Sequence, residues 1–387
     1  MLNDFNLRYM NFRLIIYVLI LSSIGVLVVS SATINTVNDG LGKRQVMGII
    51  LGMLTLVCAM IIDYKYYIKL GWLFYAASIA CLLLVFIFGT YRGGARRWIE
   101  LPIIGQFQPS EVAKIMLIIF FAMYLSKIDN KLNSPLYLLS IVGFAAVPVF
   151  SIFRQPNLST TIVLTFIIIA MSFVAGLSYK WIIGTVGVLV PSMFIIVRMV
   201  MDGRRTFLNT YMENRILAFF RPDNFAGGKY QQENSVMAIA SGMLNGKGLN
   251  TNALDSVKNG KFLPEVQTDF IFAIIGEELG FVGSIVVITL IALIVMECLI
   301  MAAKAKNLEG RLICSGIAAL IAFQSFTNIA VATNIFPNTG LPLPFVSYGL
   351  TSLVSSFVGI GLVLNIGIYG RKNKLGGQID EYRFNCT

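Results

Sequence analysis

Residues 261–296 read KFLPEVQTDFIFAIIGEELGFVGSIVVITLIALIVM, a polar stretch that changes after Asp269 into a long apolar run. The run continues to residue 302, which is longer than the roughly 17–25 residues that cross a bilayer as one helix. We therefore expect an interfacial helix followed by a transmembrane helix. Asp269 then lies at the membrane–water boundary, where a carboxylate is costly unless it is paired or used. Two interpretations are open: Thr268 or Asp269 caps the helix, or Asp269 performs chemistry.

The composition of the whole chain places it in a bilayer. Of its 387 residues, 57% are hydrophobic and 13% are charged, and the mean hydropathy is +0.78. Soluble proteins carry roughly 25% charged residues. The chain has no His and no CxxC pair among its five cysteines, which argues against a disulfide framework and against zinc or haem sites built on imidazole. Any proton transfer therefore falls to Asp, Glu or Lys.

Ten apolar stretches have the length of a membrane span. They are residues 13–31, 45–62, 70–89, 111–125, 136–153, 158–177, 180–201, 271–302, 310–335 and 345–369. The predicted fold class is therefore an all-α integral membrane protein with about ten transmembrane helices. One large extracytoplasmic loop, residues 202–268, separates the seventh helix from the eighth. Residues 1–372 form a single polytopic domain, and residues 373–387 form a short cytoplasmic tail.

The charges between the spans predict the orientation. An even number of spans puts both termini on one side. On that side lie the basic residues Arg8, Arg13, Lys65, Lys69, Lys127, Lys131, Lys180, Lys304, Lys306, Arg311, Arg371, Lys372 and Lys374. By the positive-inside rule this side is cytoplasmic, so we expect a multi-pass protein of the cytoplasmic membrane. The net charge of +11 suits contact with membrane lipids and gives no separate reason to invoke nucleic acid.

Basic residues on the predicted outer side oppose this rule. The loop 90–108 carries Arg92, Arg96 and Arg97, and the loop 202–268 carries Arg204, Arg205, Arg215, Arg221, Lys229, Lys247, Lys258 and Lys261. A bound phosphate or pyrophosphate would retain them, because the arginine fork matches phosphate oxygens. Contact with anionic lipid headgroups is the alternative.

Three further segments are informative. QPSEVAK at 108–114 puts Glu111 and Lys114 on one helical face, either as a structural pair or as the lining of a polar cavity. NTGLPLPFVSYG at 338–349 cannot be a regular helix. NSVMAIASGMLNGKGL at 234–249 is apolar with small residues and predicts a helix or a re-entrant piece on the membrane surface.

Several motifs, taken in order, resemble the SEDS family (shape, elongation, division and sporulation), which includes RodA, FtsW and SpoVE. They are GARRWI at 94–99, QPSEVAK at 108–114, YQ at 230–231, AIASG at 238–242, GKGL at 246–249, PEVQTDFIFA at 264–273, QSFTN at 324–328 and GLPLPFVSYG at 340–349. Each piece alone is weak, but their order and spacing are specific.

The resemblance implies a ten-helix inner-membrane enzyme that polymerises lipid II on the outer face and works with a class B penicillin-binding protein. The essential aspartate of the family's TDF motif corresponds to Asp269, and the arginine before Trp-Ile corresponds to Arg97. The family's PSE…K pair corresponds to Glu111 and Lys114, and an outer-loop arginine before YQ corresponds to Arg215.

The chain departs from the family's usual pattern at several positions. It reads QPNLST where QPDLGT is usual, so that Asn157 and Ser159 replace a carboxylate and a glycine. Leu350 follows SYG in place of glycine, and Asn234 and Ala240 replace Gln and Gly. The loss of the carboxylate at 157 removes a negative charge near the predicted cavity, but leaves Asp269 in place.

The implied reaction is an inverting glycosyl transfer, which needs a base and a positive charge for the departing pyrophosphate. Asp269 is the candidate base, and Arg97 with Arg96 or Arg215 is the candidate pyrophosphate clamp. A divalent cation could share that work, but no carboxylate cluster dictates a metal site. Two alternatives are a lipid II flippase, which should place polar groups near the midplane or on both sides, and a non-enzymatic scaffold.

Overall fold

The computed structural model describes residues 10–34, 40–92, 95–101, 105–204, 206–221, 226–250, 263, 266–338 and 340–369. The predicted tail 373–387 lies outside the described residues. So do the predicted basic positions Arg8, Arg205, Lys258, Lys261, Arg371 and Lys372.

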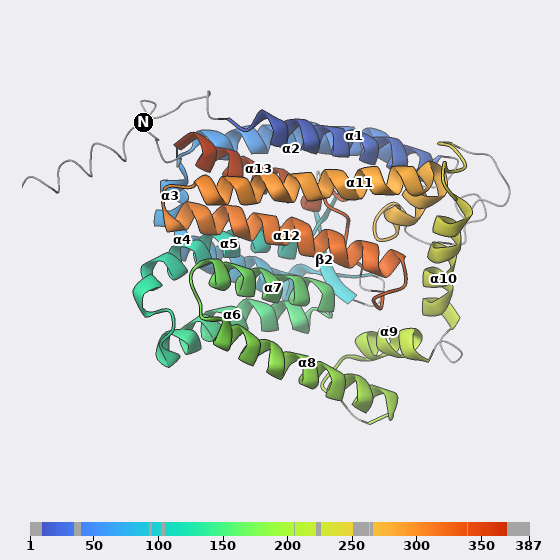
Figure 1. The fold of residues 1–387 in the computed structure, drawn as a ribbon. Helices are drawn as coiled ribbons and strands as arrows, with labels where there is room; N and C mark the ends of the chain where they lie inside the picture. Colours follow the sequence, from blue (N-terminus) through green and yellow to red (C-terminus); the bar gives the residue numbers. More distant parts are fainter. Residues whose placement is uncertain are drawn as a thin grey trace, which may run out of the picture.

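Most of the described chain is helical (Figure 1). The long helices are α1 (Phe12–Thr33), α2 (Leu41–Ile61), α4 (Gly71–Phe88), α5 (Pro109–Lys127), α6 (Pro135–Arg154), α7 (Leu158–Val174), α8 (Tyr179–Met201), α11 (Ile271–Lys304), α12 (Leu308–Ala332) and α13 (Leu350–Tyr369). Shorter helices are α3 (Tyr64–Lys69), α9 (Thr210–Phe220) and α10 (Ala226–Ser241).

The ten long helices correspond to the ten predicted spans. Within the described residues, nine helices are long and apolar enough to cross a membrane, and the 17-residue α7 is a shorter apolar helix. One predicted boundary is wrong, because residues 345–349 belong to the loop before α13. There Phe345 has a φ of 64°, a left-handed conformation that a helix does not contain.

The predicted division of the eighth span into two parts is present in α11. This helix has 34 residues and is interrupted at Gly280, where φ is 66° and ψ is −164°. That conformation is essentially restricted to glycine. Residues 271–279 therefore form a short helix that is separate from the membrane-crossing part.

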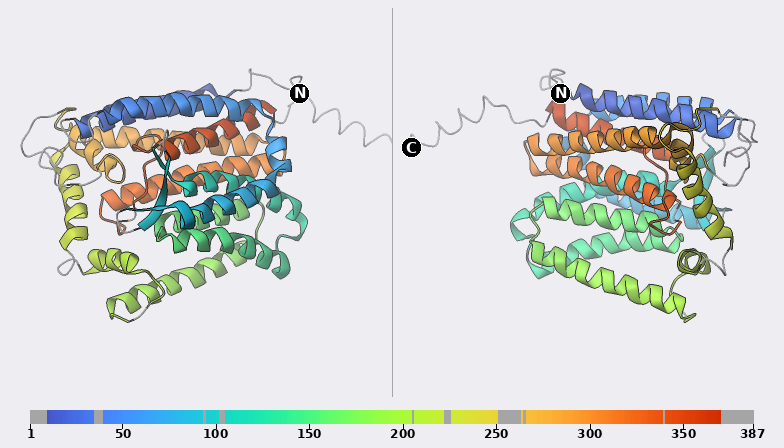
Figure 2. Two further views of the ribbon diagram at one scale, coloured as in Figure 1. Left: turned by 180° about the vertical axis from the view of Figure 1, so that it is seen from behind. Right: turned by 45° about the vertical axis from the view of Figure 1, so that its right-hand side comes forward.

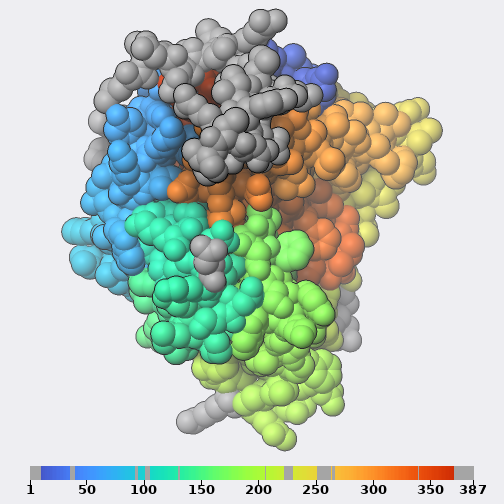
Figure 3. Space-filling view, turned by 60° about the vertical axis from the view of Figure 1, so that its left-hand side comes forward, coloured from blue at the N-terminus to red at the C-terminus, as the bar shows by residue number. Residues whose placement is uncertain are grey.

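The helices differ strongly in burial. In the apolar windows of α13 and α5, 89% and 78% of the residues are buried, whereas none is buried in α8. The helices α5, α12 and α13 therefore form the centre, and α8 lies at the edge (Figures 1 and 2). The space-filling view also places the yellow-green residues of α8 and α9 at one edge, away from the blue N-terminal helices (Figure 3).

The bundle has two distinct ends. The start of α1 and the end of α13 lie at the same end as α3, which we call the α3 end (Figure 1). The opposite end, called the α10 end, carries α9, α10 and the segment between α12 and α13 (Figure 2). The described lysines of the short loops, Lys65, Lys69, Lys127, Lys131, Lys180, Lys304 and Lys306, lie on segments at the α3 end.

A small sheet at the α10 end replaces what the sequence indicated only as a loop. The strands β1 (Thr90–Arg92), β2 (Ala95–Leu101) and β3 (Gly105–Phe107) pair antiparallel in the order β1-β2-β3. Thr90 is opposite Trp98, and Ile99 is opposite Phe107. The segment between α4 and α5 therefore forms two short hairpins that share strand β2.

The turn after α10 packs backbone to backbone against the first part of α11. The amide of Lys247 donates to the carbonyl of Glu277 at 2.9 Å, and their side chains form an ion pair at 3.1 Å. A Cβ added at Gly242 would lie 1.9 Å from the carbonyl oxygen of Gly276. Glycine is therefore required at 242 because two backbones meet there.

This contact predicts that Gly242→Ala destabilises the protein. The added methyl group forces the turn away from α11, and overpacking of this kind costs about 1–3 kcal/mol. We expect a lower melting temperature in detergent. Gly143→Ala in α6 is the matched control, because a Cβ there meets nothing within 4 Å. Equal melting temperatures for the two variants would contradict the close contact.

Candidate active site

Asp269 lies in a turn and does not cap the following helix. Residues 266–270 form turns, and α11 begins at Ile271 with Phe270 in the N-cap position. A phenylalanine side chain has no hydrogen-bonding atom, and no side-chain cap is present. The interpretation of Thr268 or Asp269 as the N-cap is therefore wrong. The Asp269 side chain is half-buried at the α10 end.

Hydrogen bonds fasten this turn to two other motifs. The Asn328 side chain on α12 donates to the Asp269 carbonyl at 3.0 Å and to the Leu341 carbonyl at 2.7 Å. The Ser347 hydroxyl donates to the Thr268 carbonyl at 2.6 Å. The turn, QSFTN and GLPLPFVSYG are therefore held together although they lie far apart in the sequence.

Asp269 and Arg215 meet around Gly340. A Cβ added at Gly340 would lie 3.0 Å from Oδ2 of Asp269 and 3.7 Å from Nη1 of Arg215. Gly340 itself has a φ of 70°, which L-residues rarely adopt. Arg215 also donates to the Asn338 carbonyl at 2.9 Å. Both predicted residues thus lie beside the same loop.

The two adjacent arginines of β2 have different surroundings. Successive side chains of a strand point to opposite faces. The Arg97 side chain is buried and donates to the carbonyls of Gln155 and Pro156, just before α7. Arg96 instead donates to the carbonyls of Phe86 and Ile87 at 2.8 and 3.1 Å and so caps the end of α4.

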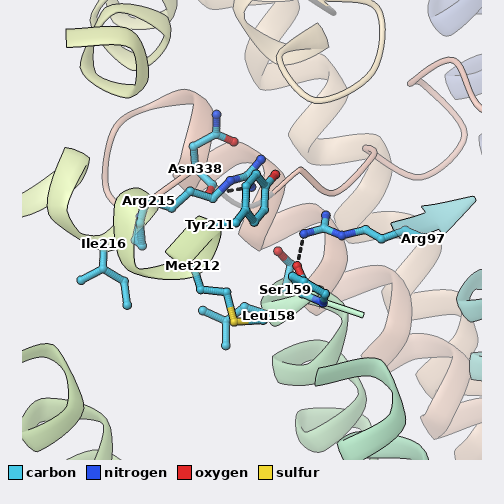
Figure 4. A pocket seen from close by; sticks show the side chains of 10 residues that line it. Arg97, Leu158, Ser159, Tyr211, Met212, Arg215, Ile216 and Asn338 are labelled. Carbon is cyan, nitrogen blue, oxygen red and sulfur yellow. Dashed lines mark hydrogen bonds between the residues drawn. The ribbon is translucent and has the colours of Figure 1, made fainter. Parts of the chain in front are cut away.

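A pocket between α7, α9 and the loop after α12 contains Arg97 and Arg215 (Figure 4). Its unoccupied space is about 310 Å³, including the part open to solvent. The polar lining residues are Arg97, Ser159, Tyr211, Arg215 and Asn338, and the apolar ones are Pro156, Leu158, Met212, Ile216 and Pro337. Arg96, Glu111, Lys114 and Asp269 are not among the lining residues.

The pocket is cationic. Burial lowers the pKa of Arg97 to about 10, and the nearby charge of Arg215 adds to the lowering, whereas Tyr211 and Asp269 oppose it. A pKa of about 10 still leaves Arg97 charged at neutral pH. Two guanidinium groups therefore border one pocket, with a carboxylate nearby. Such an arrangement suits a ligand with several negatively charged oxygens.

Glu111 and Lys114 form a buried pair inside the bundle, at 2.8 Å. Lys114 also donates to the Gln324 side chain at 2.7 Å, and Gln324 donates to the carbonyl of Pro342 at 3.0 Å. The pair is therefore connected to the loop that carries Gly340. Of the two interpretations of this pair, the contacts favour the structural one.

The structure shows the surroundings of the positions at which this chain departs from the family's usual pattern. The Asn157 side chain accepts a hydrogen bond from the Thr160 amide at 3.3 Å and caps α7. A carboxylate is not required for that cap. Ser159 lines the pocket, and Leu350 is the first residue of α13. Asn234 is buried and Ala240 is exposed on α10.

Two residues of the candidate site, Asn328 and Tyr211, were not predicted from the sequence. Asn328 belongs to a quoted motif, but its contact with the Asp269 turn is 59 residues distant in sequence and leaves no local signal. Tyr211 lies four residues before Arg215 on α9, a spacing that puts both on one helical face. That spacing could have suggested Tyr211. Within the described part of the chain, no group of three or more His, Cys, Asp or Glu could hold a metal ion.

Comparison with known families identifies the family of this chain. The FtsW/RodA/SpoVE profile, described as "Cell cycle protein", matches residues 12–372. The chain belongs to this family. The resemblance seen in the motifs is therefore confirmed.

Relatives in the FtsW/RodA/SpoVE family carry an enzymatic name. FtsW of Geobacter sp. (strain M18), a "Probable peptidoglycan glycosyltransferase", is 33% identical over 361 residues, covering 90% of this chain and 94% of the relative. The peptidoglycan glycosyltransferase MrdB of Escherichia coli (strain K12) is 33% identical over 334 residues, covering 84% and 85%. The chain is a peptidoglycan glycosyltransferase of the SEDS family and a multi-pass bacterial membrane protein.

Solved structures confirm the fold class. A chain from a peptidoglycan synthase complex that coordinates polymerization and crosslinking matches with a TM-score of 0.75 at 27% identity, covering 92% of this chain and 97% of that chain. A point mutant of the rod shape determining protein RodA of Thermus thermophilus matches with a TM-score of 0.70 at 24% identity, covering 94% and 99%. The second match concerns the fold alone.

The surroundings of Gly340 predict that Gly340→Ala lowers glycosyl transfer. The new Cβ would crowd the Asp269 carboxylate and would need a left-handed backbone. If Asp269 is a reacting group, we expect a reduction of about tenfold or more, because displacement of such a group by about 1 Å can cost on the order of 100-fold in rate. Initial rates of glycan synthesis measure it. Gly349→Ala in the same loop is the control, because its Cβ would meet only Ser352 at 3.8 Å. An equal rate for both variants would contradict the crowding.

Proposed function

We propose that this chain polymerises lipid II by inverting glycosyl transfer on the outer face of the cytoplasmic membrane. The observation that carries the proposal is the meeting of Asp269 and Arg215 around Gly340, beside the pocket that also contains Arg97. A carboxylate and two guanidinium groups at one end of a membrane bundle are the groups that this reaction needs.

The proposed chemistry divides between these groups. The 4-hydroxyl of an acceptor GlcNAc attacks the anomeric carbon of a donor MurNAc, and undecaprenyl pyrophosphate leaves. The α-linked donor becomes a β-1,4 linkage, so the configuration inverts. Asp269 takes the hydroxyl proton as general base. The half-buried position of its carboxylate in the turn supports this role, because a base must reach the substrate.

Arg97 and Arg215 are the proposed pyrophosphate clamp. Arginine forks bind phosphate oxygens in two places at once and stabilise the charge on the leaving group. The apolar lining by Leu158, Met212 and Ile216 supports a ligand whose phosphates continue into a hydrocarbon chain. Arg96 has no part in the clamp, since its guanidinium caps α4.

Glu111 and Lys114 act on the site indirectly in this proposal. Their ion pair and the bond from Lys114 to Gln324 favour a positioning role for the loop at Pro342, instead of direct substrate binding. Breaking a buried pair by removing one partner leaves an uncompensated charge. We therefore expect mutation of either residue to lower activity indirectly, through the loop that carries Gly340.

The proposed orientation puts both termini in the cytoplasm and the α10 end outside. The lysine-rich segments at the α3 end support it through the positive-inside rule. The similarity to a chain of a peptidoglycan synthase complex supports a class B penicillin-binding protein as partner, which would crosslink the strands that this chain makes.

The assignment of the base predicts that Asp269→Asn abolishes polymerisation. General base catalysis contributes about 10²–10⁴-fold, and the isosteric amide cannot accept the proton. Purified protein with labelled lipid II and its partner measures the rate, and the melting temperature reports folding. Asp202→Asn, at an exposed carboxylate after α8, is the control. Near-normal strand synthesis by the Asp269 variant would refute the assignment.

We expect substitutions of the two arginines of β2 to have opposite effects on rate and on stability. Arg97→Gln should lower the polymerisation rate about 100-fold, the order expected for loss of one transition-state donor. Arg96→Gln should lower the melting temperature, through a loss of about 1 kcal/mol in capping bonds, and leave the rate of the folded protein near normal. Rate and melting temperature are measured for both. A clamp built on Arg96 would reverse the pattern.

A further inference from the structure

Tyr211 lies between the two arginines of the pocket (Figure 4). The guanidinium carbon of Arg215 is 4.5 Å from the centre of the Tyr211 ring, and that of Arg97 is 5.4 Å from it. No step of the proposed chemistry uses this tyrosine.

The Tyr211 ring offsets the electrostatic repulsion between Arg97 and Arg215. Two guanidinium groups that border one pocket repel each other. A cation within about 6 Å of an aromatic ring is attracted by its electron-rich face, and both arginines meet that distance. The ring therefore stabilises each charge and occupies the space into which the side chains would otherwise move.

Backbone carbonyls also accept hydrogen bonds from both arginines. Arg97 donates to the carbonyls of Gln155 and Pro156, and Arg215 donates to the carbonyl of Asn338. An arginine has five N–H donors in a planar fork, so donors remain for a ligand after the bonds to the carbonyls have formed. The ring and the carbonyls together fix where each fork lies.

Tyr211 is itself placed by the start of α9. The Asn209 side chain accepts from the Tyr211 amide at 3.2 Å as the helix N-cap. Thr206 and Glu213 bond to each other across the same first turn. Tyr211 and Arg215 are one helical turn apart, which stacks one above the other. The ring is therefore held before any ligand binds.

We propose that Tyr211 is a positioning residue that spaces Arg97 and Arg215 so that each fork takes one phosphate of a lipid diphosphate. The ring lies between the two guanidinium groups, whose carbons are 4.5 and 5.4 Å from its centre, so the proposal implies that a monophosphate engages one fork and a diphosphate engages both. The inference rests on the proposed function, because it concerns the leaving group of that reaction, but it is tested by binding as well as by turnover.

The test compares two inhibitors of the full-length protein with its partner. Undecaprenyl pyrophosphate and undecaprenyl phosphate are titrated against lipid II polymerisation by the wild type and by Tyr211→Leu and Tyr211→Phe. Loss of the ring should weaken inhibition by the diphosphate about tenfold and leave inhibition by the monophosphate nearly unchanged. The KM for lipid II should rise more than kcat falls. Tyr211→Phe keeps the ring and should stay within about threefold of the wild type.

A merely structural role would not change the ratio of the two inhibition constants. Tyr211→Met is a second variant without a ring, in case the leucine variant does not fold. Tyr230→Leu, at an exposed tyrosine of α10, is the control. An unchanged diphosphate-to-monophosphate ratio in a folded variant without the ring would overturn the proposal.

Failure of the proposed function gives a different result. If the wild type makes no glycan from lipid II, direct binding of radiolabelled undecaprenyl pyrophosphate and undecaprenyl phosphate is measured on the same variants. A diphosphate preference that disappears with the ring would then support the role of Tyr211 alone. A wild type without that preference would overturn it.

Discussion

The Asn328 side chain donates to the carbonyls of Asp269 and Leu341 at 3.0 and 2.7 Å, and the arrangement of the site depends on these two bonds. Both carbonyls belong to irregular backbone at the end of a membrane bundle. An unsatisfied polar group there costs several kcal/mol. Because one side chain serves both segments, α12, the Asp269 turn and the loop with Gly340 form a single unit.

Carboxamides perform the same task elsewhere in the bundle. Gln324 bonds to the carbonyl of Pro342, and Gln232 on α10 bonds to the carbonyl of Phe336. At the α3 end, Asn365 donates to carbonyls at the end of α2. A neutral amide both donates and accepts, and its burial costs less than that of a charge. This explains how a chain with few charges keeps several irregular segments next to the membrane.

The sequence indicated which residue types the candidate site contains, but it did not predict their geometry. The family resemblance pointed to Arg97, with Arg96 or Arg215 as its partner in the clamp, and a loop at 90–108 gave no reason to exclude Arg96. In strand β2 Arg96 and Arg97 point to opposite faces, and only Arg97 reaches the pocket. Glu111 and Lys114 were correctly paired by their helical spacing, but that spacing could not reveal whether a cavity lay beside them. Tyr211 was missed because its importance comes from two arginines on different elements.

The sequence by itself determined the ten apolar spans, the division of the eighth into two parts, the family, and Asp269, Arg97 and Arg215 as candidates for chemistry. These follow from hydropathy and motifs, which are properties of neighbouring residues. The tertiary structure alone decided that Asp269 is not a cap, that Arg96 faces away, and that Tyr211 separates the two pocket arginines. Each of these depends on contacts between segments far apart in the chain, and such contacts are determined by packing and by the need to satisfy every buried backbone group.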